Sequence, residues 1–236
     1  MIDQYKSGSY FIDNKRHFED SNYKVRAIWR LLKPIVSKEG ISINSYADVG
    51  CGSGGVVSGL SNLLKKSGIQ LSEICGFDVS PHVRNLKFDK ISFYEKDFVE
   101  HGKRFDLVTL TDVFEHVTAP MDFIRRIGSL AGLVVFHVPL DDCLAVNMRN
   151  LQRSKIKNPG HLVFLNVNSA LNLITNAGYK IIDYDYSRET LTAPSNVASI
   201  LQKIFFPIKF IFFKISPWLM SRIFGFSLVV VAKLDQ

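Results

Sequence analysis

Residues 47–55 read Ala-Asp-Val-Gly-Cys-Gly-Ser-Gly-Gly, and this stretch decides the fold. The preceding run, residues 41–47, carries β-branched and aromatic side chains and predicts a strand. Residues 56–66 have apolar side chains at helical spacing and predict a helix. Glycines between a strand and a helix let the backbone turn sharply and approach a ligand, toward which the first N–H groups of the helix point. We therefore expect a loop that cradles a nucleotide-like ligand.

Size and composition indicate a folded domain with a basic surface. The chain has 236 residues, 47% of them apolar, enough to bury a sizeable core. Its formal net charge of +7 suits phosphorylated metabolites, nucleic acid or an anionic membrane as partners, and serves simple solubility equally well. The three cysteines lie far apart without a CxxC pair, so we expect neither a disulfide framework nor a metal site.

Alternating strands and helices predict an α/β fold with a doubly wound, mostly parallel sheet. The expected strands are residues 41–47, 73–77, 91–94, 105–110, 133–138, 179–186 and 226–232. The expected helices are residues 23–36, 56–66, 81–86, 120–130 and 168–176. Asp20 and Ser21 are expected to cap the first helix and Pro34 to weaken its end, while residues 140–161 are expected to be irregular. Asn168 and Ser169 are expected to cap the last of these helices.

We expect a single domain over residues 1–236, with four segments. They are an N-terminal helical cap or lid (1–40), a cofactor-binding core (41–190), an aromatic and basic helical insertion (191–225) and a final strand (226–236). Lysine and arginine interrupt the apolar side chains of residues 199–225, so a membrane-spanning helix is not expected there. This segment could cover the substrate pocket, form a homodimer surface or contact an acidic membrane peripherally. The sequence contains no recognisable nucleic-acid-binding module, so nucleic acid is not expected as a partner.

The glycine spacing alone leaves two cofactor classes open. Gly50, Gly52 and Gly54 suit a methyltransferase, whereas Gly50, Gly52 and Gly55 match the dinucleotide fingerprint of oxidoreductases. Asp48 favours the first class, because its carboxylate attracts the ammonium of an amino acid and repels a pyrophosphate. Asp78 ends the next strand and can accept hydrogen bonds from ribose hydroxyls, or it can simply cap the helix ahead of Pro81.

Four motifs in order resemble those of class I S-adenosylmethionine-dependent methyltransferases. They are residues 47–55, Gly76-Phe77-Asp78-Val79-Ser80, Asp97-Phe98, and Phe105-Asp106-Leu107-Val108 followed by Asp112-Val113-Phe114-Glu115-His116-Val117. The last motif looks like the subgroup of ubiquinone-biosynthesis-type and sugar or small-molecule O-methyltransferases. The resemblance covers residues 41–185 and implies a Rossmann-like, seven-stranded sheet, mostly parallel with an antiparallel last strand and flanked by helices. It also implies S-adenosyl-L-methionine as the cofactor.

The resemblance assigns the cofactor to residues at the strand ends. The expected set is Asp48, Gly50, Gly52, Gly54, Asp78, Val79, Asp97, Phe98, Thr111, Asp112 and Lys24. The glycines would hold the methionine part, Asp78 the ribose, and Asp97 with Phe98 the adenine. Thr111 and Asp112 would lie beneath the sulfonium. Lys24 stands where the subgroup often has a basic residue for the cofactor carboxylate, but a solvated helix lysine explains it too.

Three histidines are candidates for the base that takes a proton from an acceptor hydroxyl. His116 and His161 rank above His137, Glu115 could orient a neighbouring histidine, and each histidine could instead have a structural role. We expect a cytoplasmic methyltransferase, with membrane association left open, that methylates oxygen on a small or lipid-linked, anionic sugar-type acceptor. The alternatives are a nicotinamide-dependent oxidoreductase and a methyltransferase-like protein that binds without catalysis.

Overall fold

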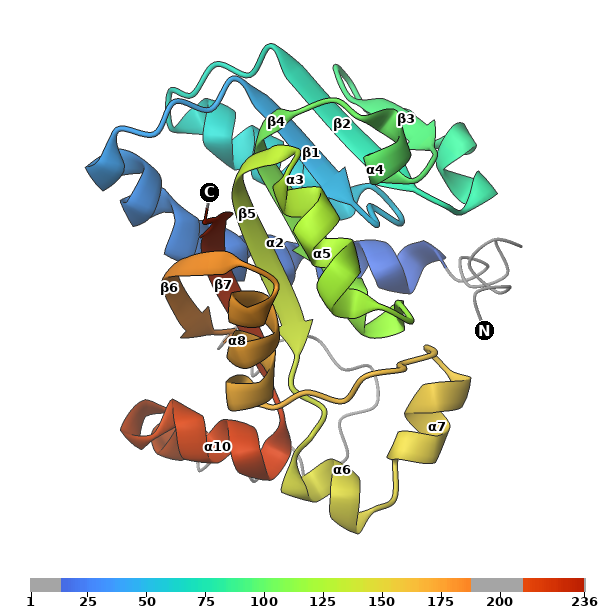
Figure 1. The fold of residues 1–236 in the computed structure, drawn as a ribbon, viewed down its shortest axis with the longest axis vertical. Helices are drawn as coiled ribbons and strands as arrows, with labels where there is room; N and C mark the ends of the chain where they lie inside the picture. The colour runs from blue at the N-terminus through green and yellow to red at the C-terminus, as the bar shows by residue number, and fades with distance from the viewer. Residues whose placement is uncertain (1–13, 188–209, 236) are drawn as a thin grey trace.

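The computed structural model describes residues 14–187 and 210–235 and shows a central sheet between two layers of helices (Figure 1). The strands are β1 (Ser45–Val49), β2 (Glu73–Asp78), β3 (Ser92–Glu95), β4 (Phe105–Thr111), β5 (Ala131–Pro139), β6 (Tyr179–Tyr186) and β7 (Ser227–Leu234). The α-helices include α2 (Asn14–Glu39), α3 (Gly55–Lys66), α4 (Phe98–His101), α5 (Pro120–Gly128), α6 (Leu144–Met148), α7 (Gln152–Lys157), α8 (Val167–Asn176) and α10 (Pro217–Phe224). Two 3₁₀ turns, η2 (Pro81–Asn85) and η3 (Phe114–His116), follow β2 and β4.

The sheet has the order β3-β2-β1-β4-β5-β7-β6. Neighbouring strands from β3 to β5 pair in parallel, whereas β7 runs antiparallel to both β5 and β6. This confirms the predicted seven-stranded, mostly parallel sheet with an antiparallel last strand. The final strand inserts between β5 and β6, so β6 is the edge strand.

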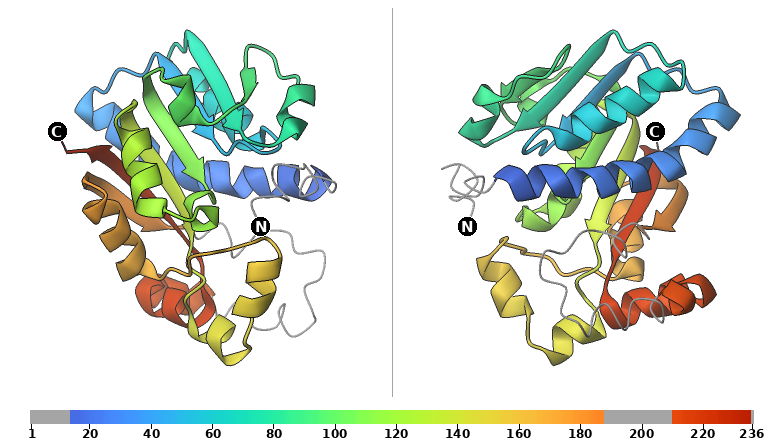
Figure 2. Two further views of the ribbon diagram at one scale, coloured as in Figure 1. Left: turned by 45° about the vertical axis from the view of Figure 1, so that its right-hand side comes forward. Right: turned by 180° about the vertical axis from the view of Figure 1, so that it is seen from behind.

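Each face of the sheet packs against its own helical layer. One core joins α2 and α3 to side chains such as Tyr46, Leu133 and Val229, and the other joins α5 and α8 to Val134 and Phe136. Adjacent residues of β5 and β7 alternate between the two cores, as the two-residue period of a strand requires. Figure 2 shows α2 crossing the back of the sheet, where residues 25–36 pack into the core with α3, while Ser21 and Lys24 of the same helix line the cavity described below.

The first helix begins earlier and ends later than predicted. It starts at Asn14 and not at an Asp20–Ser21 cap, and it runs through Pro34 to Glu39. Proline removes one helical hydrogen bond, but Leu32, Ile35 and Val36 around it are buried in the core with α3, and this packing maintains the helix.

The stretch predicted to be irregular contains two short helices, α6 and α7. Helix α7 buries no side chain, which explains why the apolar pattern gave no signal for it. Helix α8 is capped by Asn166, whose side chain accepts from the N–H groups of Asn168 and Ser169, and not by those two residues. Of the predicted insertion, residues 191–209 lie outside the described residues, whereas residues 210–215 and α10 are helical. No helix among residues 14–187 and 210–235 is long and apolar enough to cross a membrane.

Candidate active site

The glycine loop bends between β1 and α3 at the carboxyl end of the sheet. Gly50 N–H and Cys51 N–H both donate to the carbonyl of Phe77, at 2.8 and 3.0 Å, and join the loop to β2. Gly50 has a φ of +71°, and a Cβ added there would lie 2.5 Å from Cγ2 of Val113. A side chain at Gly50 would therefore meet both backbone strain and a clash, so this position requires glycine.

Two buried aspartates flank the loop at the ends of β1 and β2. The carboxylate of Asp48 accepts from Thr109 Oγ1 at 2.6 Å, and Asp48 is 1% exposed. Burial raises the pKa of Asp48 to about 7, helped by the nearby Asp78 and opposed by the Thr109 hydrogen bond. Asp78 accepts from Gly52 N–H and Ser80 N–H, each at 2.9 Å, so it fixes the glycine loop, whereas the cap of the turn after β2 is Ser80 and not Asp78. Burial also raises the pKa of Asp78.

A cavity of about 500 Å³ opens at these strand ends. This volume is within the range of ligand-binding clefts. It gathers most of the predicted site residues: Lys24, Asp48, Gly50, Gly52, Asp78, Val79, Asp97, Phe98, Thr111, Asp112, His116 and His161. Gly54 and His137 are not among its lining residues; Gly54 is the N-cap of α3 and packs beside Phe88 and Phe93.

Asp112 holds two partners beneath the cavity. It follows β4 with a φ of +54°, a left-handed conformation unusual for a residue with a side chain. One carboxylate oxygen lies 2.8 Å from Nζ of Lys24 and the other 2.7 Å from Nδ1 of His137. Although burial alone would raise the pKa of Asp112, Lys24 and His137 hold it well below its usual range.

These contacts change the interpretation of two predicted residues. Lys24 is a partly buried, ion-paired residue of the cavity wall and not a solvated helix lysine. Although burial alone would lower the pKa of Lys24, Asp112 raises it, so the ammonium stays charged. His137 has a fully buried side chain that pairs with Asp112 and does not reach the cavity, so it orients Asp112 and is not in position to act as the base.

His116 and His161 line another part of the cavity, which we call the histidine wall, and their ring centroids lie 4.8 Å apart. The part lined by residues 48–53 and Asp78 we call the glycine-loop wall. The two histidines meet because Leu162 N–H and Val163 N–H donate to the carbonyl of Glu115, at 2.8 and 3.2 Å. Nδ1 of His116 lies 3.1 Å from the carbonyl oxygen of Gly160. Since a carbonyl only accepts, Nδ1 carries the proton and Nε2 is the accepting nitrogen. Burial, and after it the neighbouring His161, lowers the pKa of His116 to about 4, so this ring is neutral at pH 7.

His161 has a carboxylate partner that sequence reasoning missed. Nδ1 of His161 lies 2.7 Å from Oδ2 of Asp141, and the same oxygen lies 2.9 Å from Nζ of Lys155. Although burial alone would raise the pKa of Asp141, His161 and Lys155 hold it below its usual range. The carboxylate lies at ion-pair distance from the ring, although neither Nδ1 of His161 nor Oδ2 of Asp141 has a partner at hydrogen-bonding angles among the described residues. Nineteen residues lie between the two partners, so no local motif indicated the pair.

The burial of Glu115 is the second feature of the site that the sequence did not predict. It is 1% exposed, and among the described residues neither of its carboxylate oxygens has a hydrogen-bond partner. Burial, followed by the charge of Asp112, raises the pKa of Glu115 well above its usual range. Ligand atoms of Glu115, His116 and His161 lie within 4.8 Å of one another, so these three side chains could also hold a metal ion.

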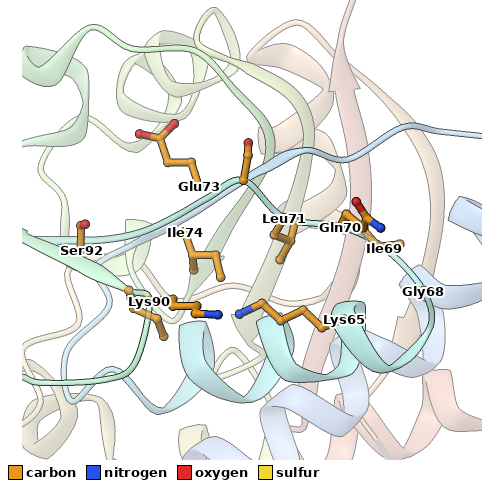
Figure 3. Close-up of a pocket in the computed structure, with 11 residues that line it drawn as sticks. Lys65, Gly68, Ile69, Gln70, Leu71, Glu73, Ile74, Lys90 and Ser92 are labelled. Atoms are coloured by element: carbon orange, nitrogen blue, oxygen red, sulfur yellow. The ribbon is translucent and has the colours of Figure 1, made fainter.

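A second hollow, of about 770 Å³, lies at the opposite end of the sheet (Figure 3). It is bordered by the end of α3, the connection into β2 and the start of β3, with the ammonium groups of Lys65 and Lys90 pointing toward one another. Its acidic lining residue, Glu73, is paired with Lys103 at 2.6 Å. None of the predicted site residues lines this hollow, and the cavity at the carboxyl ends is therefore the candidate active site.

Comparison with known proteins agrees with this geometry. A family model described as a methyltransferase domain matches residues 19–184. No curated protein sequence matches the chain significantly.

Solved structures of low sequence identity share the fold. One is magnesium protoporphyrin IX methyltransferase from Synechocystis PCC 6803 with bound SAH (14% identity, 90% of this chain and 84% of that chain covered, TM-score 0.54). Another is a SAM-dependent methyltransferase from Archaeoglobus fulgidus (18% identity, 89% and 96% covered, TM-score 0.52). A third comes from the Haloferax volcanii complex between the Trm112 methyltransferase activator and a methyltransferase (15% identity, 94% and 96% covered, TM-score 0.60). The family match spans most of the chain and decides between the two cofactor classes that the glycine spacing left open: the chain belongs to the methyltransferase-domain family, as an S-adenosylmethionine-dependent methyltransferase.

Proposed function

We propose that the cavity holds S-adenosylmethionine along its glycine-loop wall and a hydroxyl-bearing acceptor along its histidine wall. The observation that carries this proposal is the pairing of His161 with Asp141 at the cavity. General-base catalysis requires an imidazole held in place with one ring nitrogen that can take a proton, and the contact of Nδ1 with Asp141 reserves Nε2 for that task. O-methylation, unlike methylation at an electron-rich carbon or sulfur, needs such a base when the acceptor is a hydroxyl.

The glycine-loop wall fits the cofactor residue by residue. Asp48 is buried and has no salt bridge among the described residues, so it suits the ammonium of the methionine part. The turn at Gly50, with its positive φ, exposes backbone to the cavity. The cationic Nζ of Lys24 suits the cofactor carboxylate. Cofactor binding here replaces the missing cationic partner of Asp48, which favours its ionised form.

The adenosine end would lie along β2 and α4. Each oxygen of Asp78 already accepts one backbone N–H and retains a lone pair for a ribose hydroxyl. Asp97 caps α4 through Val99 N–H at 2.8 Å, and its second oxygen remains for the adenine amino group beside Phe98. When bound, the cofactor supplies an activated methyl group that requires no further electrophilic assistance.

The chain's own residues then have two tasks at the acceptor. The first is alignment: the acceptor oxygen must lie in line with the methyl group while the walls exclude water. The second is removal of the hydroxyl proton by Nε2 of His161, with Asp141 stabilising the imidazolium that forms. His116 contributes the adjacent accepting Nε2 and the shape of this wall.

For the acceptor we propose a small or lipid-linked, anionic sugar-type hydroxyl compound, in keeping with the resemblance to ubiquinone-biosynthesis-type and sugar O-methyltransferases. Lys155 beside Asp141, and the excess of basic over acidic residues, support an anionic acceptor. A second copy of the chain is the competing partner for residues 210–225, and the mass of the protein in solution tests for it.

Calorimetric titration with S-adenosylmethionine tests the cofactor, and labelled methyl transfer to a panel of hydroxylated acceptors tests the chemistry. We expect saturable binding and a product heavier by one methylene group at oxygen. Absence of binding at millimolar cofactor would refute the first half. Transfer to nitrogen or carbon acceptors alone would refute the second.

A further inference from the structure

We propose that one end of the molecule docks on an anionic phospholipid membrane. We call it the basic end and define it as residues 144–157, which contain α6 and α7, residues 210–215 and α10. Figures 1 and 2 show α6, α7 and α10 together beyond the carboxyl ends of the central strands, at the bottom of each view. This proposal concerns a surface and does not depend on the chemistry of the cavity.

The basic end carries one sign of charge. The sequence has no aspartate or glutamate between residues 143 and 182, nor between residues 190 and 234, although the whole chain has 22 of them. Arg149, Arg153, Lys157 and Lys214 are exposed there. Each basic residue close to an anionic bilayer contributes about 1 kcal/mol to binding, so four or more form an effective electrostatic attachment.

Large apolar side chains are exposed among these charges. The most exposed are Met148, at 77%, and Ile215, at 72%. The others are Leu144, Ile156, Phe210, Ile211, Phe212, Trp218, Leu219 and Phe224. Single exposed apolar residues are ordinary, but such a gathering on one end marks an interaction surface.

The exposed face is held outward by packing on the other side. Phe213 is buried, with its ring 5.1 Å from that of Phe226, and Met220 of α10 is buried as well. The opposite faces of these two helical segments, with Ile211, Ile215 and Trp218, are left exposed. The apolar surface therefore follows from how the helices are anchored.

Two cation–aromatic pairs suit the boundary between headgroups and acyl chains. Nζ of Lys214 lies 4.8 Å from the ring centre of Phe210, and the guanidinium of Arg222 lies 5.4 Å from that of Trp218. In each pair the ring can enter the apolar layer while the cation stays at the phosphate level.

Charge also argues against a second copy as the occupant. A two-fold dimer through this surface would place the basic end of one chain against the same groups of its partner, with no acid on either side. An anionic bilayer supplies the complementary charge instead. The helix α7 leads directly into Pro159, Gly160 and His161 of the cavity wall, so a docked molecule would have its active site beside the membrane surface.

Sedimentation with vesicles tests the proposal on the full-length chain without cofactor. We expect binding to vesicles of phosphatidylglycerol and phosphatidylcholine, little binding to phosphatidylcholine alone, and release by salt. Arg149→Glu/Lys214→Glu should lower the partition coefficient at least tenfold. Lys65→Glu/Lys90→Glu makes the same charge change at the opposite end (Figure 3) and should leave most of the binding intact.

A second variant, Ile215→Ser, addresses the apolar part, with Met121→Ser on α5 as its control. It should weaken vesicle binding several-fold while unfolding temperature stays within about 2 °C of the wild type. Equal binding to both vesicle types, or equal loss in the Lys65/Lys90 variant, would overturn membrane docking. A wild-type dimer that Ile215→Ser converts to a monomer without any effect on vesicle binding would assign the surface to a second copy.

Discussion

The two walls of the cavity are built in different ways. The glycine-loop wall comes from short segments at the ends of β1 and β2, where backbone conformation and two aspartates fix the geometry. The histidine wall comes from η3 and from residues 139–161, which meet through hydrogen bonds between residues 44 or more positions apart. The first wall therefore depends mainly on backbone shape, and the second on which side chains are paired.

The walls differ in electrostatics as well. Asp48 is buried beside a hydroxyl group, and burial raises its pKa. Asp141 has a histidine and a lysine, which lower its pKa. A carboxylate that lacks a cation is prepared to receive one from a ligand, whereas a paired carboxylate is prepared to orient its partner. The difference supports the proposed division, with binding at the first wall and proton transfer at the second, and the following changes test it.

The largest effect is expected from His161→Ala. It removes the proposed base, so kcat should fall by about 10²–10⁴-fold. The affinity for S-adenosylmethionine should stay within about twofold, because His161 belongs to the other wall. Asp141→Asn should cost less, about 10–100-fold in kcat, since it removes only the orienting partner. Steady-state kinetics with calorimetric affinities give both quantities.

His116→Ala and a chelator control the assignment. If His116→Ala lowers kcat more than His161→Ala does, His116 is the base and Asp141 has a structural role. Activity lost to EDTA and restored by a divalent cation would instead make Glu115, His116 and His161 a metal centre. If His161→Ala retains more than about a tenth of the wild-type kcat, His161 is not the base.

The next effect is expected from Gly50→Ala. The added Cβ would meet Val113 in a residue that must also keep a φ of +71°. We expect cofactor affinity to fall by about tenfold or more and stability to fall by about 1–3 kcal/mol. Gly102→Ala is the matched control, because Gly102 has a φ of +74° and nothing within 4 Å of the added atom. The difference between the two variants gives the effect of the clash with Val113. The double variant Gly50→Ala/Val113→Ala should recover part of the lost affinity and stability.

The contrast between the two walls explains how much of the site could be predicted from the sequence. The residues of the glycine-loop wall are local, and strand ends of a parallel sheet meet at one edge, so Asp48, Gly50 and Asp78 could be predicted together. The family resemblance included Lys24 in the same set, but its ion pair with Asp112 could not be predicted, since it joins a helix to a distant strand. His161 could be proposed from its place in the chain, but not its partner Asp141, because α6 and α7 lie between them and α7 has no buried face.

The overall fold could be predicted from the sequence more fully than the bounds and pairing of its elements. Seven strands and their order of appearance follow from apolar runs, and the final strand's direction follows from the family resemblance. The extension of α2 through Pro34 depends on burial against α3, a tertiary effect that local propensity opposes. The insertion of β7 between β5 and β6 likewise depends on pairing that residues 227–234 do not encode locally.

A smaller effect is expected from pH acting through Asp48. Its folded pKa of about 7 lies above its ordinary value near 4, so without ligand it holds a proton below pH 7. A cationic ligand requires the ionised form, so cofactor affinity should rise with pH up to about 7 and then level. The expected slope below pH 7 approaches about tenfold in Kd per pH unit. Calorimetry between pH 5.5 and 8 measures it, and Asp48→Asn should bind weakly with no such slope.

The smallest effect is expected from Glu115→Gln, which tests the protonation state of the histidine wall. The folded pKa of Glu115 is raised, so its neutral form is favoured, and the associated stability is present below the unfolded pKa of about 4.3 and lost as pH rises toward the folded value. Glutamine stays neutral at every pH. The variant should therefore unfold at the wild-type temperature near pH 4.5 and at a higher temperature at pH 8, as scanning calorimetry would measure. If Glu115→Gln instead unfolds at a lower temperature than the wild type at pH 8, Glu115 is ionised in the wild type and paired with a bound cation. Glu115 would then be a ligand-binding carboxylate and not a protonated one.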